Sequence, residues 1–304
     1  MINGICKKCG KLIPIPEEIS EFSCMYCGRK LTKSDLLISE NRDPARAREY
    51  FDAAVEKIPA CVLEHRDIVS EFTREEYASS FKKYMKSCFR TFDTLNSAAI
   101  LDPENGSKYV RTAADTLLSE LEADWEKQPG WSTKKGRRAI IDGDKMVIAL
   151  YLVPTVGKLS LSVSDEFNTY LNNIWMEKYP KSPFYIGDYD KISDSYYSRL
   201  HCYITTAVCR SEGKPDDCRE LELLRSFRDG WLAKTEEGRE LINEYYRLAP
   251  KIVTCMELTG GDYGELNRRY IAPCVEDIEA GRNERCRDRY VSMVRELERR
   301  YLKM

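Results

Sequence analysis

Two short cysteine turns, Cys6-Lys7-Lys8-Cys9-Gly10 and Cys24-Met25-Tyr26-Cys27-Gly28, decide the fold at the start of this 304-residue chain. Two residues between paired cysteines let both sulfur atoms point at one centre. The glycine after each pair lets the turn open its backbone N–H groups toward the sulfurs without a clash from a Cβ atom. Residues 11–23, between the two turns, can form a short hairpin. Together these features outline a small β ribbon.

The four cysteines predict a metal site. Four thiolates, from Cys6, Cys9, Cys24 and Cys27, close a tetrahedral zinc shell, so we expect a structural Zn²⁺ ion in a zinc ribbon over residues 1–34. The alternatives are a dithiol redox pair or unrelated buried cysteines. A redox motif needs only one pair, in a βαβ setting, which favours zinc.

Composition indicates a soluble globular protein. Hydrophobic residues make up 42% of the chain and charged residues 32%. The formal net charge of −2 gives no general attraction to nucleic acid or anionic membranes. The longest apolar run, 146–154, is too short to span a bilayer, so no membrane partner is expected. Twelve cysteines without an evident export signal predict reduced thiols and a cytoplasmic location.

Almost everything after residue 35 has helical periodicity. Asp43-Pro44 and Thr73-Arg74-Glu75-Glu76 are helix starts, and apolar residues from 77 to 99 recur every three or four positions. We expect an interruption near Gly143 and a kink or stop at Pro250. The predicted fold is mainly α, a multi-helix body with a small N-terminal β zinc ribbon. The predicted domains are 1–34, 35–200 and 201–304, with the last two separate or joined in one body.

Residues 201–254 contain several ordered blocks of one pattern. The blocks are Cys202-Tyr203-Ile204-Thr205-Thr206-Ala207, Arg225-Ser226-Phe227-Arg228-Asp229, Tyr245-Tyr246 and Ala249-Pro250. This order resembles the CFI-box C-terminal domain family. The chain departs from the commoner form at Val208-Cys209-Arg210, which replaces an aromatic-glycine step. No activity is settled for that family, so the resemblance implies architecture and not mechanism.

Cys202 is the sharpest catalytic candidate, next to His201. A helix N-terminus following the cysteine would lower its pKa, but sequence neighbours rarely face each other, and a buried structural thiol is the other interpretation. His201, Cys202, Cys209 and Cys218 match no common metal-ligand spacing. Three nearby acidic residues fit a helix N-terminus better than a cation site; they are Asp216, Asp217 and Glu220.

Arginine clusters leave two interpretations open. Arg225 and Asp229 are four residues apart and can pair, with Arg228 beside them. One interpretation is a structural network with Tyr245 or Tyr246, and the other is a clamp that binds an anion or a carboxylate. A basic last helix is usually a solvated face, and nucleic acid or an acidic partner is the alternative. Its basic residues are Arg282, Arg285, Arg287, Arg289, Arg295, Arg299, Arg300 and Lys303.

The sequence favours a non-catalytic interaction or adaptor protein with a protein partner. There is no phosphate-binding glycine loop, dinucleotide fingerprint, metalloprotease helix or nucleophile elbow. One alternative is a cysteine-dependent enzyme using Cys202. The other is a nucleic-acid binder that uses the last helix and the basic residues of the ribbon, which are Lys7, Lys8, Lys11, Arg29, Lys30 and Lys33.

Overall fold

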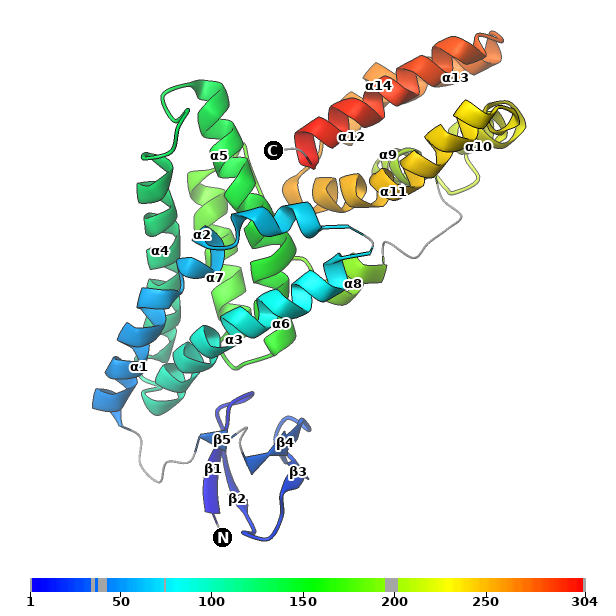
Figure 1. Cartoon of the computed structure of the whole chain (residues 1–304). Helices are drawn as coiled ribbons and strands as arrows, with labels where there is room; N and C mark the ends of the chain where they lie inside the picture. The colour runs from blue at the N-terminus through cyan, green and yellow to red at the C-terminus, as the bar shows by residue number, and fades with distance from the viewer. Residues whose placement is uncertain (1, 34–35, 38–42, 74, 195–201, 303–304) are drawn as a thin grey trace. The chain divides into compact units, whose positions relative to one another are not determined.

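A computed structural model describes residues 2–33, 36–37, 43–73, 75–194 and 202–302. Helices follow a small N-terminal β region, which confirms the mainly α prediction (Figure 1). The chain divides into two compact units, Met1–Arg66 with Ser79–Tyr189 and Asp67–Ala78 with Asp190–Met304. The predicted domain boundaries at residues 34 and 200 lie outside the described residues.

Each cysteine turn joins two antiparallel strands. The strands are β1 (Ile2–Cys6), β2 (Leu12–Ile15), β3 (Glu21–Ser23), β4 (Lys30–Thr32) and β5 (Leu36–Leu37). β2 and β5 pair with the two edges of β1, and β3 pairs with β4. The predicted hairpin within residues 11–23 is therefore wrong. Because each Cys-x-x-Cys-Gly turn reverses the chain, the strands that flank one turn meet each other.

The ribbon has a very small core. Its buried members are two of the cysteines and four aliphatic residues, namely Cys6, Ile13, Ile15, Cys24, Leu31 and Leu36. A domain of this size buries too little apolar surface to be stable on that basis alone. Other contributions must hold it together.

The helical part of the first unit combines long amphipathic helices with shorter ones. They are α1 (Pro44–Lys57), α2 (Ala60–Leu63), α3 (Tyr77–Leu101, in this unit from Ser79), α4 (Gly106–Trp125), α5 (Lys134–Val147), α6 (Val153–Leu159) and α7 (Ser164–Lys178). The predicted stripe of α3 is largely buried, with Phe81, Cys88, Phe92 and Leu95 all inside. α4 packs on α7, and α6 packs on α7 as well.

The second unit is also helical. Its elements are α8 (Tyr189–Asp194, in this unit from Asp190), α9 (Tyr203–Ser211), α10 (Arg219–Gly230), η4 (Leu232–Lys234), α11 (Glu236–Thr259), α12 (Tyr263–Leu266), α13 (Ala272–Glu279) and α14 (Asn283–Tyr301). α11 packs on α9 and α14, and α10 packs on α9 and α13. The short 3₁₀ segment η2 (Arg66–Glu71) lies at the boundary of the two units.

Prolines shape the helices differently from the sequence prediction. No break occurs at Gly143, and α11 continues through Pro250. Instead, wide π turns precede two other prolines: η3 (Ile148–Leu152) lies before Pro154, and η5 (Asn267–Ile271) lies before Pro273. A π turn tolerates the missing N–H and the bulk of the proline ring, so the helix continues instead of ending.

Candidate metal centre

The two cysteine turns bring four sulfur atoms together. The sulfurs of Cys6, Cys9, Cys24 and Cys27 all lie within 4.8 Å of one another. The Cys6–Cys27 distance is 3.9 Å and the Cys9–Cys24 distance is 3.7 Å. A disulfide bond is about 2.05 Å long, so these are free thiols. The group is placed to bind a metal ion.

The backbone of the two turns is nearly identical. In each turn the N–H of the first cysteine donates to the carbonyl five residues later, over 3.0 Å for Cys6 and 2.8 Å for Cys24. The glycine N–H returns to the carbonyl of that cysteine over 2.8 Å in both. Gly10 and Gly28 have φ angles of 67° and 70°. This left-handed conformation explains the glycine after each pair, because other residues enter it at a cost.

Backbone N–H groups also face the sulfurs. Cys6 and Cys24 each accept hydrogen bonds from the N–H groups two and three residues later. Burial raises the pKa of Cys6 to about 12. At Cys24 the N–H donors, together with contacts to the Cys27 and Cys9 side chains, outweigh burial and lower the pKa to about 7. N–H donors stabilise thiolates, but four negative sulfurs at these distances need a cation. The electrostatics therefore fit a metal-bound state.

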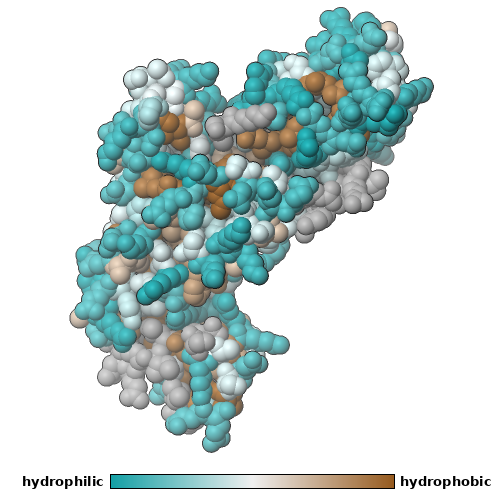
Figure 2. All heavy atoms as spheres, viewed as in Figure 1, coloured by the Kyte–Doolittle hydropathy of each residue, from teal (hydrophilic) through white to brown (hydrophobic). Residues whose placement is uncertain are grey.

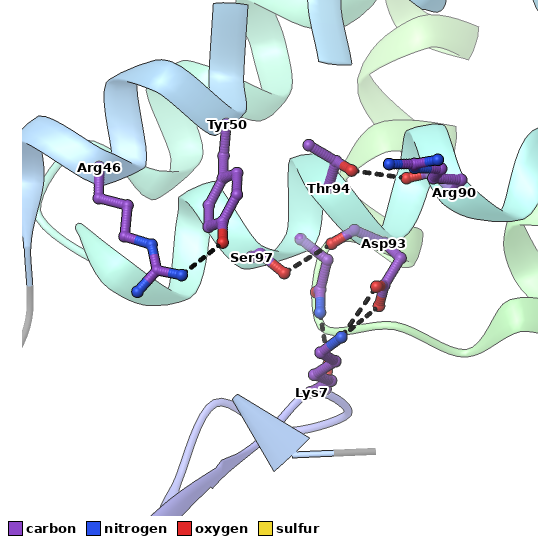
Figure 3. A network of polar contacts seen from close by, with 8 residues as sticks. Lys7, Arg46, Tyr50, Arg90, Asp93, Thr94 and Ser97 are labelled. Carbon is purple, nitrogen blue, oxygen red and sulfur yellow. Dashed lines mark hydrogen bonds and ion pairs between the residues drawn. The ribbon is translucent and has the colours of Figure 1, made fainter. Parts of the chain in front are cut away.

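Lys7, inside the first turn, fastens the ribbon to the helical part of its unit. Its ammonium lies 2.8 and 3.0 Å from the two carboxylate oxygens of Asp93 on α3 (Figure 3). Its carbonyl accepts from the Asn96 side chain at 2.9 Å and from the Ser162 N–H at 3.1 Å. The Ser162 hydroxyl in turn donates to the Asn96 carbonyl oxygen at 2.6 Å. One residue between two sulfur ligands thus anchors the turn.

Arg29 makes the equivalent contact from the second turn. It follows Gly28 directly and donates to the carbonyls of Leu159 and Ser160, at 3.3 and 3.0 Å, at the end of α6. Both cysteine turns are therefore bonded to the helical part of the first unit.

The second turn also carries exposed apolar side chains. Met25 is 71% exposed, Tyr26 is 58% exposed and Leu12 on β2 is 52% exposed. Lys11 lies 6.0 Å from the Tyr26 ring. Figure 2 shows the hydropathy of one face of the molecule, on which apolar atoms lie among a largely hydrophilic surface. The second turn thus leaves two large apolar side chains exposed.

Cys202 is buried at the start of α9. Its sulfur accepts from Arg228 at 3.6 Å, and it lines an apolar pocket with Phe227 and Tyr245. Burial raises its pKa, although Arg228 and Arg225 lower it. The net effect disfavours the thiolate form, which a catalytic cysteine would need. Its predicted partner His201 lies outside the described residues.

The arginine network differs from the helix-spacing prediction. Asp229 is bound by Arg228, its direct neighbour, through two contacts of 2.7 Å, and not by Arg225. Arg228 also donates to the Tyr246 hydroxyl at 2.6 Å, which holds its side chain. Arg225 donates instead to the carbonyl of Asp216 at 2.9 Å. This arrangement ties α10 to α11 and to the loop before α10.

Most described arginines of the last helix take part in ion pairs. Arg282, Arg285 and Arg289 surround the buried Asp277, with the closest contact at 2.9 Å. Arg295 binds Glu244 at 2.6 Å. These are the pairs of a solvated, charge-balanced face.

The structure brings together two of the residues considered for a second metal site, Cys209 and Cys218, and adds Glu220. The ligand atoms of these three residues lie within 4.8 Å of one another. Their spacing matches no familiar motif, and the sequence predicts Glu220 only as a residue of a helix start. Only the folded loop between α9 and α10 could have indicated the grouping.

Comparison with known proteins adds no relative. No protein-family model matches the chain, and no curated protein or solved structure matches it. Within the described residues, no helix combines the length and apolar character needed to cross a membrane.

Proposed function

We propose that the protein is a zinc-binding interaction protein of the cytoplasm, in which a Cys6-Cys9-Cys24-Cys27 ribbon organises a surface for a protein partner. The observation that carries the proposal is the spacing of the four sulfurs. A tetrahedron with metal–sulfur bonds of about 2.3 Å has edges of about 3.8 Å. The sulfur distances of 3.7 and 3.9 Å agree with that value.

Zinc is the ion that we favour for this site. Four thiolates in a tetrahedron suit zinc or iron, and the closed shell leaves no position for a substrate. A structural ion also fits the small core, because metal binding supplies folding free energy that six buried side chains cannot.

A protein partner is supported by the exposed side chains of the second turn. Met25 and Tyr26 are fixed by the cysteines on either side of them, so a partner can bury them with little loss of conformational entropy. Tyrosine and methionine are enriched in protein interfaces. Lys11, whose ammonium lies 6.0 Å from the centre of the Tyr26 ring, favours a partner segment with apolar and acidic residues.

The basic residues support nucleic acid less well. Lys7 and Arg29 are bonded within the first unit. Asp277 pairs with Arg282, Arg285 and Arg289, and Glu244 pairs with Arg295. Arginines that already have carboxylate partners gain little from phosphate contacts.

The CFI-box resemblance of residues 201–254 remains a proposal about architecture. Its support is that the quoted blocks fall in α9, α10 and α11 and contact one another. Tyr245 accepts from the Ile204 N–H at 3.1 Å, and Arg228 donates to Tyr246.

Metal analysis of the full-length protein tests the zinc site. A Cys9→Ser/Cys24→Ser variant should lose one zinc per chain relative to the wild type. A Cys61→Ser variant, which removes a buried cysteine outside both clusters, should lose none. If the double variant keeps its full zinc content, or if the lost ion is iron, the zinc assignment is wrong.

Comparative affinity purification tests the surface. Proteins captured by the wild type should be lost with Met25→Ser/Tyr26→Ser at unchanged zinc content. They should be retained with Phe89→Ser, which removes another exposed aromatic side chain, 48% exposed on α3. An identical set of captured proteins for all three would refute this surface.

A further inference from the structure

Three metal-ligating side chains meet between α9 and α10, in the second unit. Cys209 lies in the last turn of α9, Cys218 lies directly before α10, and Glu220 lies in its first turn. Their two sulfurs and a carboxylate oxygen lie within 4.8 Å of one another. We propose that Cys209, Cys218 and Glu220 bind a second zinc ion, independent of the ribbon.

The loop between the two helices holds the sulfurs in place. The N–H of Lys214 returns to the carbonyl of Cys209 at 2.9 Å, and Gly213 has a φ of 70° that permits the reversal. The N–H of Cys218 donates to the carbonyl of Pro215 at 3.1 Å. Both cysteines are therefore fixed by backbone bonds before any ion binds, which lowers the entropic cost of binding.

The donor set is chemically suited to zinc. Zinc accepts thiolate sulfur and carboxylate oxygen, and three protein ligands leave a fourth position for water. Thiolate sulfur is the form that binds the ion, so binding at this pair would release the protons of both thiols.

Lys214 supplies the positive charge that pairs with the acidic residues of this loop. Its ammonium lies 2.6 Å from Glu220 and 2.8 Å from Glu212, and its side chain is 35% exposed. When zinc takes the Glu220 carboxylate, the ammonium keeps Glu212 as its partner. Binding therefore exchanges one cation for another at Glu220 and leaves no charge unpaired.

Cys202 lies in the same hydrophobic cluster as Cys209 but is not needed as a metal ligand. It contacts Cys209 and Leu221 in the core, and its sulfur is occupied by Arg228 at 3.6 Å. We therefore assign the three ligands without it.

Metal analysis distinguishes this site from the ribbon. The wild type, purified under reducing conditions, should contain two zinc ions per chain. Cys218→Ser and Glu220→Gln should each contain one, and so should the ribbon variant Cys9→Ser/Cys24→Ser. Glu222→Gln is the matched control, because Glu222 is an exposed acidic residue of the same first turn; it should retain two.

Substitution of cobalt for zinc tests directly whether sulfur atoms bind the ion. In the ribbon variant, cobalt bound at the second site should give a sulfur-to-cobalt charge-transfer absorption, and adding Cys218→Ser should abolish it. Far-UV circular dichroism of each variant establishes that the helices remain folded. Glu220→Gln, which leaves both thiols in place, serves as the second variant if Cys218→Ser does not fold.

Two results would overturn the proposal. One is a wild type with a single zinc ion that only the ribbon variant removes. The other is a Cys209–Cys218 disulfide, seen as a 2 Da mass loss in reductant-free protein that also lacks the second zinc, which would make the pair a redox couple. Loss of ribbon zinc alone would leave this site untouched and would bear only on the proposed function.

Discussion

Substitution of Gly28 by alanine tests the metal centre through its backbone. Gly28 has a φ of 70°, and a Cβ atom added there would meet no heavy atom within 4 Å. The cost is therefore conformational and not steric, about 1–2 kcal/mol for a residue with a side chain in the left-handed region. The proposed zinc site couples zinc binding to ribbon folding, so the same free energy should appear in zinc affinity, as a loss of about 5- to 30-fold.

The assay is competition for zinc between the full-length protein and a chromophoric chelator. Gly28→Asn should lose less affinity than Gly28→Ala, because asparagine enters the left-handed region more readily. Gly143→Ala is the control. Gly143 lies inside α5 with open space around its Cβ position and no positive φ. That change should leave zinc affinity unchanged and stabilise the helix by about 0.5–1 kcal/mol.

Equal zinc affinity in Gly28→Ala, Gly143→Ala and the wild type would refute this reasoning. Such a result would mean that the second turn does not adopt the left-handed conformation in the metal-bound protein. The N–H donors that this turn directs at Cys24 would then need another explanation.

Four further predictions concern single side chains. Cys9→Ser should lose one zinc per chain and keep its helical circular dichroism; a collapse of helicity would show that the helical units depend on the ribbon. Cys202→Ser should lower the free energy of unfolding by about 1–3 kcal/mol, because the new hydroxyl is buried, and native Cys202 should react slowly with iodoacetamide at neutral pH. Rapid labelling would instead favour the enzyme hypothesis. Phe227→Ala should cost about 3–5 kcal/mol in urea unfolding, since Phe227 is 7% exposed and stacks on Trp231. Arg228→Ala should also lower the melting temperature by leaving Tyr246 unpaired, and a neutral effect combined with loss of partner capture would contradict that structural role.

Local chemistry made the cysteine turns and the helices predictable. The Cys-x-x-Cys-Gly spacing specifies a turn with little dependence on its surroundings, and the apolar stripe of α3 repeats over six turns. The pairing of the strands could not be predicted in the same way. Residues 11–23 contain β2 and β3, which pair with β1 and β4 and not with each other. Which neighbour a strand meets depends on the whole ribbon and not on the segment between the turns.

Long side chains and prolines account for the other differences. Helix spacing predicts contacts between residues three or four apart, but Arg228 curls onto its direct neighbour Asp229 because Tyr246 on another helix holds it. Pro154 affects the helix before itself, in the π turn, so the irregularity appears at neither Gly143 nor the proline. The grouping of Cys209, Cys218 and Glu220 could not be predicted for a related reason. Eight residues separate the two cysteines, and only the folded loop brings their sulfurs together.

The position of the anchoring residues links the candidate metal site to the rest of the first unit. Lys7 lies between two of the four cysteines, and Arg29 follows the glycine of the other turn, so an ion held by the four sulfurs would also fix both anchors. Removal of that ion would free the turn backbones and with them the Lys7 carbonyl that Asn96 and Ser162 bind. Met25 and Tyr26 depend on the same second turn but point to solvent. One ion would therefore support an inward contact to the helices and an outward surface, and a partner that binds these side chains would recognise only the metal-bound ribbon.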